Sequence, residues 1–262
     1  RGRLEQWGWR ANRNRHATPT VHAFGIQYML SLTFTHMSKA YGGVPALRDV
    51  SLSLMGGRVH ALMGENGAGK STLIKLIAGV VPADSMTVEK DGNAISLANA
   101  QDAQAANFRF IHQELNIVPQ ISVAENILLG RRFPRRFGLA VDWPSVRERA
   151  RAALRFLGAD HIDVRQLAGD FTAGDQMLFK IAAALVTDPD TDARADLYVL
   201  DEPTAALTAQ ESEMLFDVIK RLTPTGAAVL YISHRMDEVL RICDDITVLR
   251  DGKHVSSGPV SE

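Results

Sequence analysis

A single cysteine, Cys243, is all that this chain of 262 residues contains, so no internal disulfide can form and a reducing compartment is expected. The net charge is only −1 at pH 7, which argues against a protein that binds nucleic acid through a broad basic face. Long apolar runs are also missing. The longest charge-free stretch, residues 17–38, contains Pro19, Gly25 and many polar residues, so it predicts neither a membrane-spanning helix nor a signal peptide. If the protein acts at a membrane, we expect it to do so as a peripheral subunit.

The remaining composition is that of an ordinary globular protein, with 46% hydrophobic and 23% charged residues. Residues 1–28 differ from the rest because they are rich in arginine and lack periodicity, and we predict that they form a poorly ordered N-terminal extension. The chain begins at Arg1 instead of Met and stops at Glu262, soon after a hairpin turn at Asp251-Gly252. We therefore expect a fragment of a longer protein.

The most informative segment is a glycine-rich loop between an apolar run and a helical pattern. It fits the phosphate-binding pattern G-x-x-x-x-G-K-[ST], and its residues are Gly64, Glu65, Asn66, Gly67, Ala68, Gly69, Lys70, Ser71 and Thr72. Backbone N–H groups of such a loop surround a polyphosphate, and the N-terminus of the following helix adds partial positive charge. Lys70 would reach the β and γ phosphates, and the Ser71 hydroxyl would ligate Mg²⁺. A glycine-rich turn with a chance Lys-Ser is the alternative, and the flanking strand and helix patterns argue against it.

Two apolar runs end in polar side chains that suit nucleotide chemistry. Asp201 and Glu202 follow residues 197–200, and His234 follows residues 227–232. Because ligands bind at the carboxyl ends of parallel strands, Asp201 can hold Mg²⁺ and Glu202 can polarise a water that attacks the γ-phosphate. His234 can hydrogen-bond a γ-phosphate oxygen, although its position alone suits a loop histidine with no special role.

Three other residues are weaker candidates. Gln113 lies just beyond the apolar residues 108–111, where a neutral amide can contact Mg²⁺ or the attacking water. Thr172 is a candidate N-cap of a helix over residues 176–185, and the helix N-terminus with the Gly174 backbone can receive a phosphate. On this segment alone, a capped helix without a ligand is the simpler explanation.

The chain as a whole predicts an α/β fold: a P-loop nucleotide-binding core with a mainly parallel sheet, an antiparallel β subdomain and a helical insertion subdomain. The continuous apolar runs at 197–200 and 227–232 are typical of central parallel strands that are buried on both faces. Shorter runs predict strands, listed by range: 30–34, 50–54, 59–63, 108–111, 246–249 and a hairpin over 86–97. Helical spacing predicts helices over 70–79, 123–129, 144–157 and 176–185. The predicted core spans 29–112 and 187–262, and the helical subdomain spans 113–186.

Together these elements resemble the ATP-binding cassette (ABC) family over roughly residues 30–262. Their order matches that of the family: an aromatic residue, the phosphate loop, a glutamine loop, a signature, an acidic strand end and a switch histidine. In this chain they are Tyr41, 64–72, Gln113, 171–176, Asp201-Glu202 and His234. Residues 111–119, 122–127, 201–207 and 232–236 look like the ATPase subunits of bacterial monosaccharide importers of the ribose, xylose and galactoside type. In those proteins one polypeptide carries two cassettes in tandem, and this chain would be the first.

The resemblance implies an ATP hydrolase that energises import of a monosaccharide through a separate permease, with ATP and Mg²⁺ as cofactors. The implied partners are a second cassette, the permease and indirectly a periplasmic sugar-binding protein, with no nucleic acid. The implied location is peripheral, on the cytoplasmic face of the bacterial inner membrane. Tyr41 would stack on adenine, the loop 64–72 would bind phosphates and Mg²⁺, and Gln113 would link the nucleotide to the permease.

The resemblance also implies the roles of the other candidate residues. Asp201 would support Mg²⁺, Glu202 would be the general base, and His234 would contact the γ-phosphate. Thr172 and Gly174 would contact the ATP bound by the partner cassette.

The sequence departs from the family in its signature, where Phe171-Thr172-Ala173-Gly174-Asp175 replaces the usual Leu-Ser-Gly-Gly-Gln, and at Met86. Asp175 stands where the signature has glutamine, which places a negative charge beside the polyphosphate unless the side chain turns away. Met86 stands where a glycine is common, so we expect an altered edge hairpin. Two alternatives therefore remain: an ATP-binding regulatory cassette with little hydrolysis, and a soluble cassette protein that acts on nucleic acid or ribosomes. A GTPase is disfavoured because no Asn-Lys-x-Asp motif is present.

Overall fold

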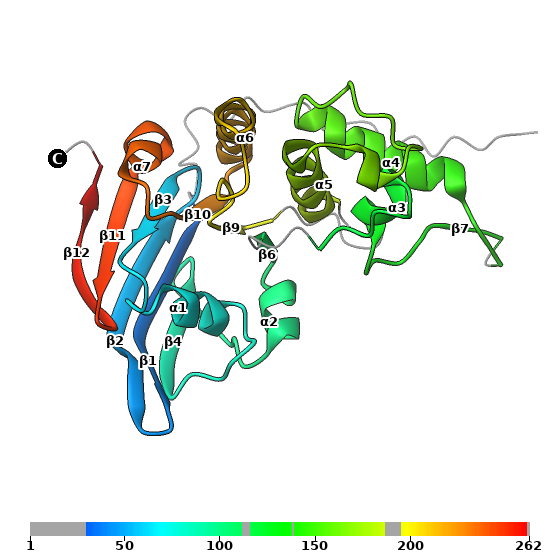
Figure 1. Ribbon diagram of the computed structural model, residues 1–262. Coiled ribbons are helices and arrows are strands. Elements are labelled where there is room, and N and C mark those ends of the chain that lie inside the picture. Colours follow the sequence, from blue (N-terminus) through cyan, green and yellow to red (C-terminus); the bar gives the residue numbers. More distant parts are fainter. Residues whose placement is uncertain (1–29, 112–115, 138, 187–194, 261–262) are drawn as a thin grey trace, which may run out of the picture.

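The computed structural model describes residues 30–111, 116–137, 139–186 and 195–260, whose arrangement is shown in Figure 1. Within these residues a six-stranded sheet has the strand order β12-β11-β3-β10-β9-β6. The strands from β11 to β6 run parallel, and β12 pairs antiparallel with β11. The strands of this main sheet are β3 (Val59–Met63), β6 (Phe108–Ile111), β9 (Leu197–Asp201), β10 (Ala228–Ile232), β11 (Asp245–Arg250) and β12 (Lys253–Pro259).

The central strands of the main sheet are apolar because both of their faces are covered. Along β10 every residue is buried, and along β9 only the last residue, Asp201, is partly exposed. One face packs against helix α1 (Lys70–Ile77) through side chains such as Leu230 and Leu62. The other face packs against helix α6 (Ala209–Leu222) through side chains such as Tyr198 and Tyr231. These two layers fix the carboxyl ends of the parallel strands at one edge of the sheet.

A second, antiparallel sheet has the order β2-β1-β4-β5 and packs over α1. Alternating side chains of its first strands, such as Leu32, Phe34, Leu52 and Leu54, are buried, as expected for a sheet with one face toward the core. The elements of this part are β1 (Ser31–Tyr41), β2 (Val44–Met55), β4 (Ser85–Lys90), β5 (Asn93–Ile95) and the short helix α2 (Ala100–Ala105).

The helices of the middle part of the chain pack mainly on each other, at the end of the molecule beyond β6 (Figure 1). They are α3 (Val123–Leu128), α4 (Trp143–Phe156) and α5 (Ala173–Leu185), with the small hairpin β7 (Arg135–Arg136) and β8 (Ala140–Val141). Helix α7 (Met236–Ile242) follows β10, and two 3₁₀ turns lie at Ala168–Asp170 and Thr223–Thr225. Among the described residues, no helix is long and apolar enough to cross a membrane.

The strands and helices predicted from the sequence are confirmed, although β1 continues to Tyr41, seven residues beyond its predicted end, and β2 begins at Val44, six residues before its predicted start. Helix α5 begins at Ala173, three residues before the predicted start, because Thr172 caps it. The β4–β5 hairpin pairs in regular register over Val88–Lys90, whereas the pairing of β4 with β1 shifts register between Thr35 and Ser38, opposite Met86. The alteration expected from Met86 stays a prediction. The helices α2, α6 and α7 were not predicted. The extension 1–28 and Gln113 lie outside the described residues, and the predicted domain boundaries stay a prediction.

Candidate functional site

The glycine-rich loop connects the end of β3 to the start of α1 in a conformation that requires glycine. Gly69 is the N-cap of α1 with φ +103°, a backbone region that favours glycine. A Cβ atom at this position would lie 2.7 Å from Leu47 Cδ2 and 2.9 Å from the Ala46 carbonyl oxygen. The Lys70 ammonium donates hydrogen bonds to the carbonyl oxygens of Gly64, at 2.6 Å, and Glu65, at 3.1 Å. The loop is therefore held against β2 on one side and by its own lysine on the other.

The loop opens into a hollow of about 260 Å³ that it shares with the carboxyl end of β9. The hollow is lined by Ala46, Glu65, Asn66, Gly67, Gly69, Lys70, Ser71, Thr72, Asp201 and Glu202. Two other loop residues contribute differently, since Gly64 offers its carbonyl to Lys70 and the Ala68 side chain is buried in the core. The structure thus brings together segments that are about 130 positions apart in the sequence, through the parallel pairing of the strands they follow.

The polar groups of this hollow fit Mg²⁺ bound together with a nucleotide. The Ser71 hydroxyl and the Asp201 carboxylate are oxygen ligands, which Mg²⁺ prefers. Across the described residues, no group of three His, Cys, Asp or Glu side chains forms a metal site by itself. Mg²⁺ in nucleotide sites commonly takes its remaining ligands from phosphate and water.

Glu202 and His234 lie next to each other at the edge of the main sheet. His234 Nδ1 is 3.3 Å from Glu202 Oε1, and the Glu202 N–H donates to the Ile232 carbonyl oxygen at 3.0 Å. Glu202 has φ +45°, which is uncommon for a residue other than glycine and often marks a functional position. The carboxylate is 23% exposed and the imidazole 60% exposed, so both are open to a ligand.

A buried carboxylate that sequence reasoning missed lies directly behind this pair. Glu238 of α7 is 3% exposed and accepts hydrogen bonds from the hydroxyl groups of Thr204, Tyr231 and Ser233 at 2.7–3.0 Å. Arg235 Nη1 lies 3.0 Å from the same carboxylate. Burial and then Glu238 raise the pKa of Tyr231, which keeps its hydroxyl a donor. The available sequence signal was a glutamate on the apolar face of a short helix, beside Val239 and Ile242.

Tyr41 lies near the hollow in the fold but is not one of its lining residues. It ends β1 and pairs with Val44 across the Gly42-Gly43 turn, while Ala46 of the same hairpin lines the hollow. The ring is 46% exposed, and Lys39 Nζ lies 5.7 Å from its centre. An exposed ring at the end of a hairpin can stack on a planar base.

The donors expected to serve a partner's phosphate are already used within this chain. Thr172 Oγ1 donates to Asp175 Oδ2 at 3.2 Å, and it accepts the Asp175 N–H at 3.2 Å as the N-cap of α5. The other oxygen of Asp175 faces His161 Nε2 at 3.1 Å, so this carboxylate is turned onto its own helix cap and His161. The Gly174 N–H donates to Glu211 Oε1 at 2.9 Å.

Glu211 is the second residue that sequence reasoning missed. Its Oε2 accepts from the Thr208 N–H and hydroxyl, both at 2.9 Å, in the capping box that starts α6. Hydrogen bonds from Thr208 and then from the Gly174 N–H lower the Glu211 pKa to about 2. A Cβ atom at position 174 would lie 2.5–2.7 Å from the Glu211 side chain, so only glycine permits this contact. The Thr208-x-x-Glu211 spacing was a readable helix-start signal, but its contact with α5 was not readable.

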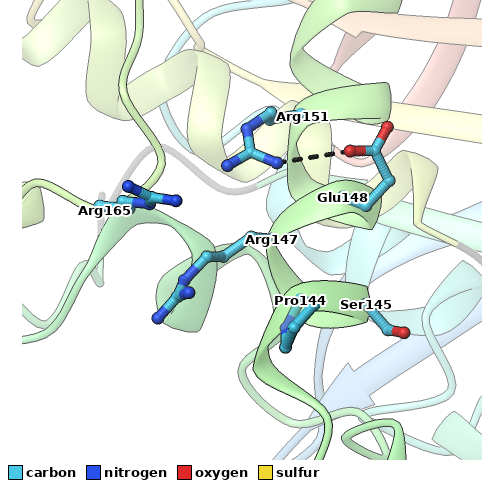
Figure 2. Close-up of a pocket in the computed structure, with 6 residues that line it drawn as sticks. All are labelled: Pro144, Ser145, Arg147, Glu148, Arg151 and Arg165. Carbon is cyan, nitrogen blue, oxygen red and sulfur yellow. Dashed lines mark hydrogen bonds and ion pairs between the residues drawn. The ribbon is translucent and has the colours of Figure 1, made fainter.

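A larger hollow, of about 450 Å³, lies away from this chemistry on α4. Figure 2 shows its arginines, Arg147, Arg151 and Arg165, with the ion pair of Arg151 and Glu148 at 3.3 Å. It contains no residue of the glycine-rich loop and no carboxyl end of a β-strand. Its long side chains extend over an open surface, so we assign the candidate site to the smaller hollow at the loop.

Comparison with known proteins is consistent with this assignment. The family model described as ABC transporter matches residues 47–205. The ribose import ATP-binding protein RbsA of Chromobacterium violaceum is 46% identical over 232 residues, which are 88% of this chain and 45% of that protein. The arabinose import ATP-binding protein AraG of Rhizobium etli is 43% identical over 231 residues, which are 88% of this chain and 44% of that protein. The chain thus spans about 45% of the length of these relatives.

Solved structures resemble the fold over most of its length. The crystal structure of an ATP-binding cassette of an ABC transporter in its ADP conformation has a TM-score of 0.75 and 28% identity, covering 88% of this chain and 91% of that one. A nucleotide-free ATP-binding cassette has the same TM-score and identity, covering 88% and 92%.

Proposed function

Because this chain belongs to the ABC transporter family, we propose that it is an ATP-binding and ATP-hydrolysing cassette that energises sugar import through a separate permease. The observation that carries the proposal is the hollow in which the glycine-rich loop meets Asp201 and Glu202. The similarity to ribose and arabinose import proteins supports a pentose or related monosaccharide as the cargo.

In this proposal each residue of the hollow has a separate task. The N-terminus of α1 and the loop N–H groups bind the phosphates, and Lys70 moves from its loop carbonyls to the β and γ phosphates. Ser71 and Asp201 would hold Mg²⁺, which would supply positive charge to the phosphates. Positioning and electrostatics supply most of the catalysis in such phosphoryl transfer.

Glu202 and His234 act on the attacked phosphate. Glu202 orients the attacking water and accepts its proton, and the neighbouring His234 donates a hydrogen bond to the γ-phosphate. Tyr41 stacks on the adenine from the end of its hairpin. Gln113 completes the link between the nucleotide and the permease.

We assign the permease contact to the surface where β6, α5 and the segment after α3 meet. A hollow of about 320 Å³ lies there, and it is lined by Phe110, Asn116, Leu129 and Lys180 among others. Leu129 is 52% exposed, which suits an apolar contact with a partner. In the sequence, Gln113 lies between Ile111 and Asn116, which border this surface. The protein would then be a peripheral subunit on the cytoplasmic face of the membrane, with a second cassette as its mate.

Steady-state ATPase activity of this chain and of Glu202→Gln, measured over a range of protein concentrations, tests the proposal. Turnover that rises with concentration in the wild type and is lost in the variant, while both bind ATP, supports a hydrolysing cassette that needs a partner. Equal turnover in both proteins would contradict the role of Glu202.

A second candidate function is a regulatory cassette that binds ATP and contributes little to hydrolysis. The specific observation in its favour is that Thr172 and Gly174 are bonded to the carboxylates of Asp175 and Glu211. Tight ATP binding without wild-type turnover at any concentration, together with no gain on addition of a second cassette, would favour this candidate.

A further inference from the structure

We propose that Glu238 is a positioning residue, which keeps the side chains of Glu202 and His234 within contact distance of each other for catalysis. The inference rests on the proposed function. Glu202 and His234 lie on two different loops, one after β9 and one after β10. Each loop has an exposed segment, and such segments need an internal anchor if their side chains are to meet within hydrogen-bond distance.

The Glu238 carboxylate is bonded to both loops. Thr204, two residues after Glu202, donates its hydroxyl hydrogen bond to Glu238 Oε1 at 2.8 Å and lies 3.0 Å from Oε2. Ser233, directly before His234, donates to Oε2 at 3.0 Å. A single side chain on α7 therefore fixes the chain near both groups of the 3.3 Å contact between Glu202 and His234.

The Glu238 carboxylate is a rigid anchor because it is buried and because both of its oxygens accept hydrogen bonds. Glu238 is 3% exposed, Thr204 is 5% exposed and Ser233 is 3% exposed. Tyr231 donates a third hydroxyl from inside β10, at 2.7 Å, and Arg235 supplies the compensating positive charge at 3.0 Å. A buried carboxylate with these donors has one favourable placement, and loss of one oxygen acceptor leaves donors unsatisfied.

Three substitutions that each remove one hydroxyl group distinguish an effect on the position of the catalytic side chains from an effect on stability. Thr204→Val, Ser233→Ala and Tyr231→Phe each remove one hydroxyl from the same carboxylate. If Glu238 acts by positioning, the first two lower kcat several-fold with unchanged KM for ATP, because they release a catalytic loop. Tyr231→Phe leaves kcat within twofold, although the melting temperature falls, because Tyr231 lies inside the strand. Equal kcat losses in all three, or the largest loss in Tyr231→Phe, would overturn the inference in favour of a structural role.

Glu238→Gln tests the carboxylate itself, with Asp237→Asn as the matched control. Asp237 is the neighbouring carboxylate, exposed and bonded to Arg235 at 3.1 Å. We expect about a tenfold or greater loss of kcat for Glu238→Gln, none for Asp237→Asn, and no further loss when Glu238→Gln is added to His234→Ala. An equal loss in the His234→Ala background would show that Glu238 does not act through His234.

A readout without turnover keeps this inference separate from the proposed function. The ring signals of His234 in histidine-labelled protein, assigned with His234→Ala, report its contact with Glu202 directly. We expect them to shift or broaden in Thr204→Val and Ser233→Ala and to stay unchanged in Tyr231→Phe. If wild-type turnover is absent even after addition of a second cassette but this pattern is observed, the proposed function fails and the positioning stands. If turnover is present and the signals do not change, the positioning fails.

Discussion

If this chain pairs with a second cassette as proposed, replacing Glu211 by glutamine should strengthen that ATP-dependent pairing. The Glu211 carboxylate accepts the Gly174 N–H at 2.9 Å, and that N–H is the donor that we expect a partner's phosphate to need. Pairing must therefore exchange one anionic acceptor for another. Glutamine at the third position of a helix can still close the capping box with Thr208, so α6 keeps its start.

The magnitude follows from the class of hydrogen bond that is broken. A hydrogen bond to a charged acceptor contributes about 1.5–3 kcal/mol, and one to a neutral acceptor contributes about 0.5–1.5 kcal/mol. Release of the Gly174 N–H is then about 1–1.5 kcal/mol easier in the variant, which corresponds to roughly five- to tenfold tighter association. Because the Glu211 pKa is lowered to about 2, the carboxylate is ionised at every pH where the protein would be assayed. The substitution also removes the repulsion between the Glu211 carboxylate and the partner's phosphate, which strengthens the association further.

Sedimentation of the chain with ATP, in a Glu202→Gln background that retains the nucleotide, measures this association. Glu213→Gln is the control because Glu213 lies on the same helix, carries the same charge and is bonded to Arg241, away from α5. Adding Asp175→Asn to Glu211→Gln should increase association further, since it removes the second carboxylate beside Thr172. If Glu211→Gln associates no more tightly than Glu213→Gln, the carboxylate does not compete with phosphate and the reasoning is refuted.

Two other predictions concern stability and nucleotide affinity. Burial lowers the His60 pKa from 6.5 to about 4, so the unfolded state binds more protons between these values and stability falls as pH falls through this window. Between pH 7 and pH 4.5 the expected loss of stability is roughly 2–3 kcal/mol. Urea unfolding at these two pH values should show a clearly smaller loss in His60→Gln than in the wild type, and equal losses in both proteins would contradict the assignment. Lys70→Ala should weaken ATP binding at least tenfold, since a charge-assisted hydrogen bond contributes about 1.5–3 kcal/mol, while AMP affinity stays unchanged. A fluorescent-nucleotide competition assay measures both affinities, and equal losses for ATP and AMP would exclude a contact to the β and γ phosphates.

The sequence was sufficient for the parts of the fold that follow from local patterns. The buried strands β9 and β10 are continuous apolar runs, and the glycine loop has a spacing that chance seldom produces between a strand and a helix. The carboxyl ends of parallel strands share one edge, so the meeting of Asp201 with the loop was predictable from the strand order of such folds. Helix α6 was missed although the Thr208-x-x-Glu211 spacing and the apolar residues after it carried a readable signal.

The contacts between distant side chains were not predictable. The Glu238 carboxylate reaches Thr204 over 34 positions, and the Glu211 carboxylate reaches Gly174 over 37 positions. Neither pair has a sequence spacing that brings it together, because the contact depends on how α7 and α6 pack beside the sheet. Asp175 illustrates the same limit. Its charge was readable, but the sequence did not reveal that its two oxygens face Thr172 and His161.

The chain between β9 and α6 connects these otherwise separate contacts. This segment starts with Glu202, and Thr204 bonds it to Glu238, which anchors the loop of His234. It ends at Thr208, which forms a capping box with Glu211. Glu211 in turn accepts the Gly174 N–H at the start of α5. A nucleotide that moves Glu202 therefore acts on a segment that is fixed at both ends by carboxylates. The anchor at Glu238 is buried, whereas the contact of Glu211 with Gly174 is partly exposed. Since the more exposed contact is the easier one to break, displacement at Glu202 should open the contact of Glu211 with Gly174 before it disturbs the Glu238 anchor, and this would release the Gly174 N–H of α5. A connected route of this kind is a physical path for coupling between the nucleotide and the Gly174 N–H.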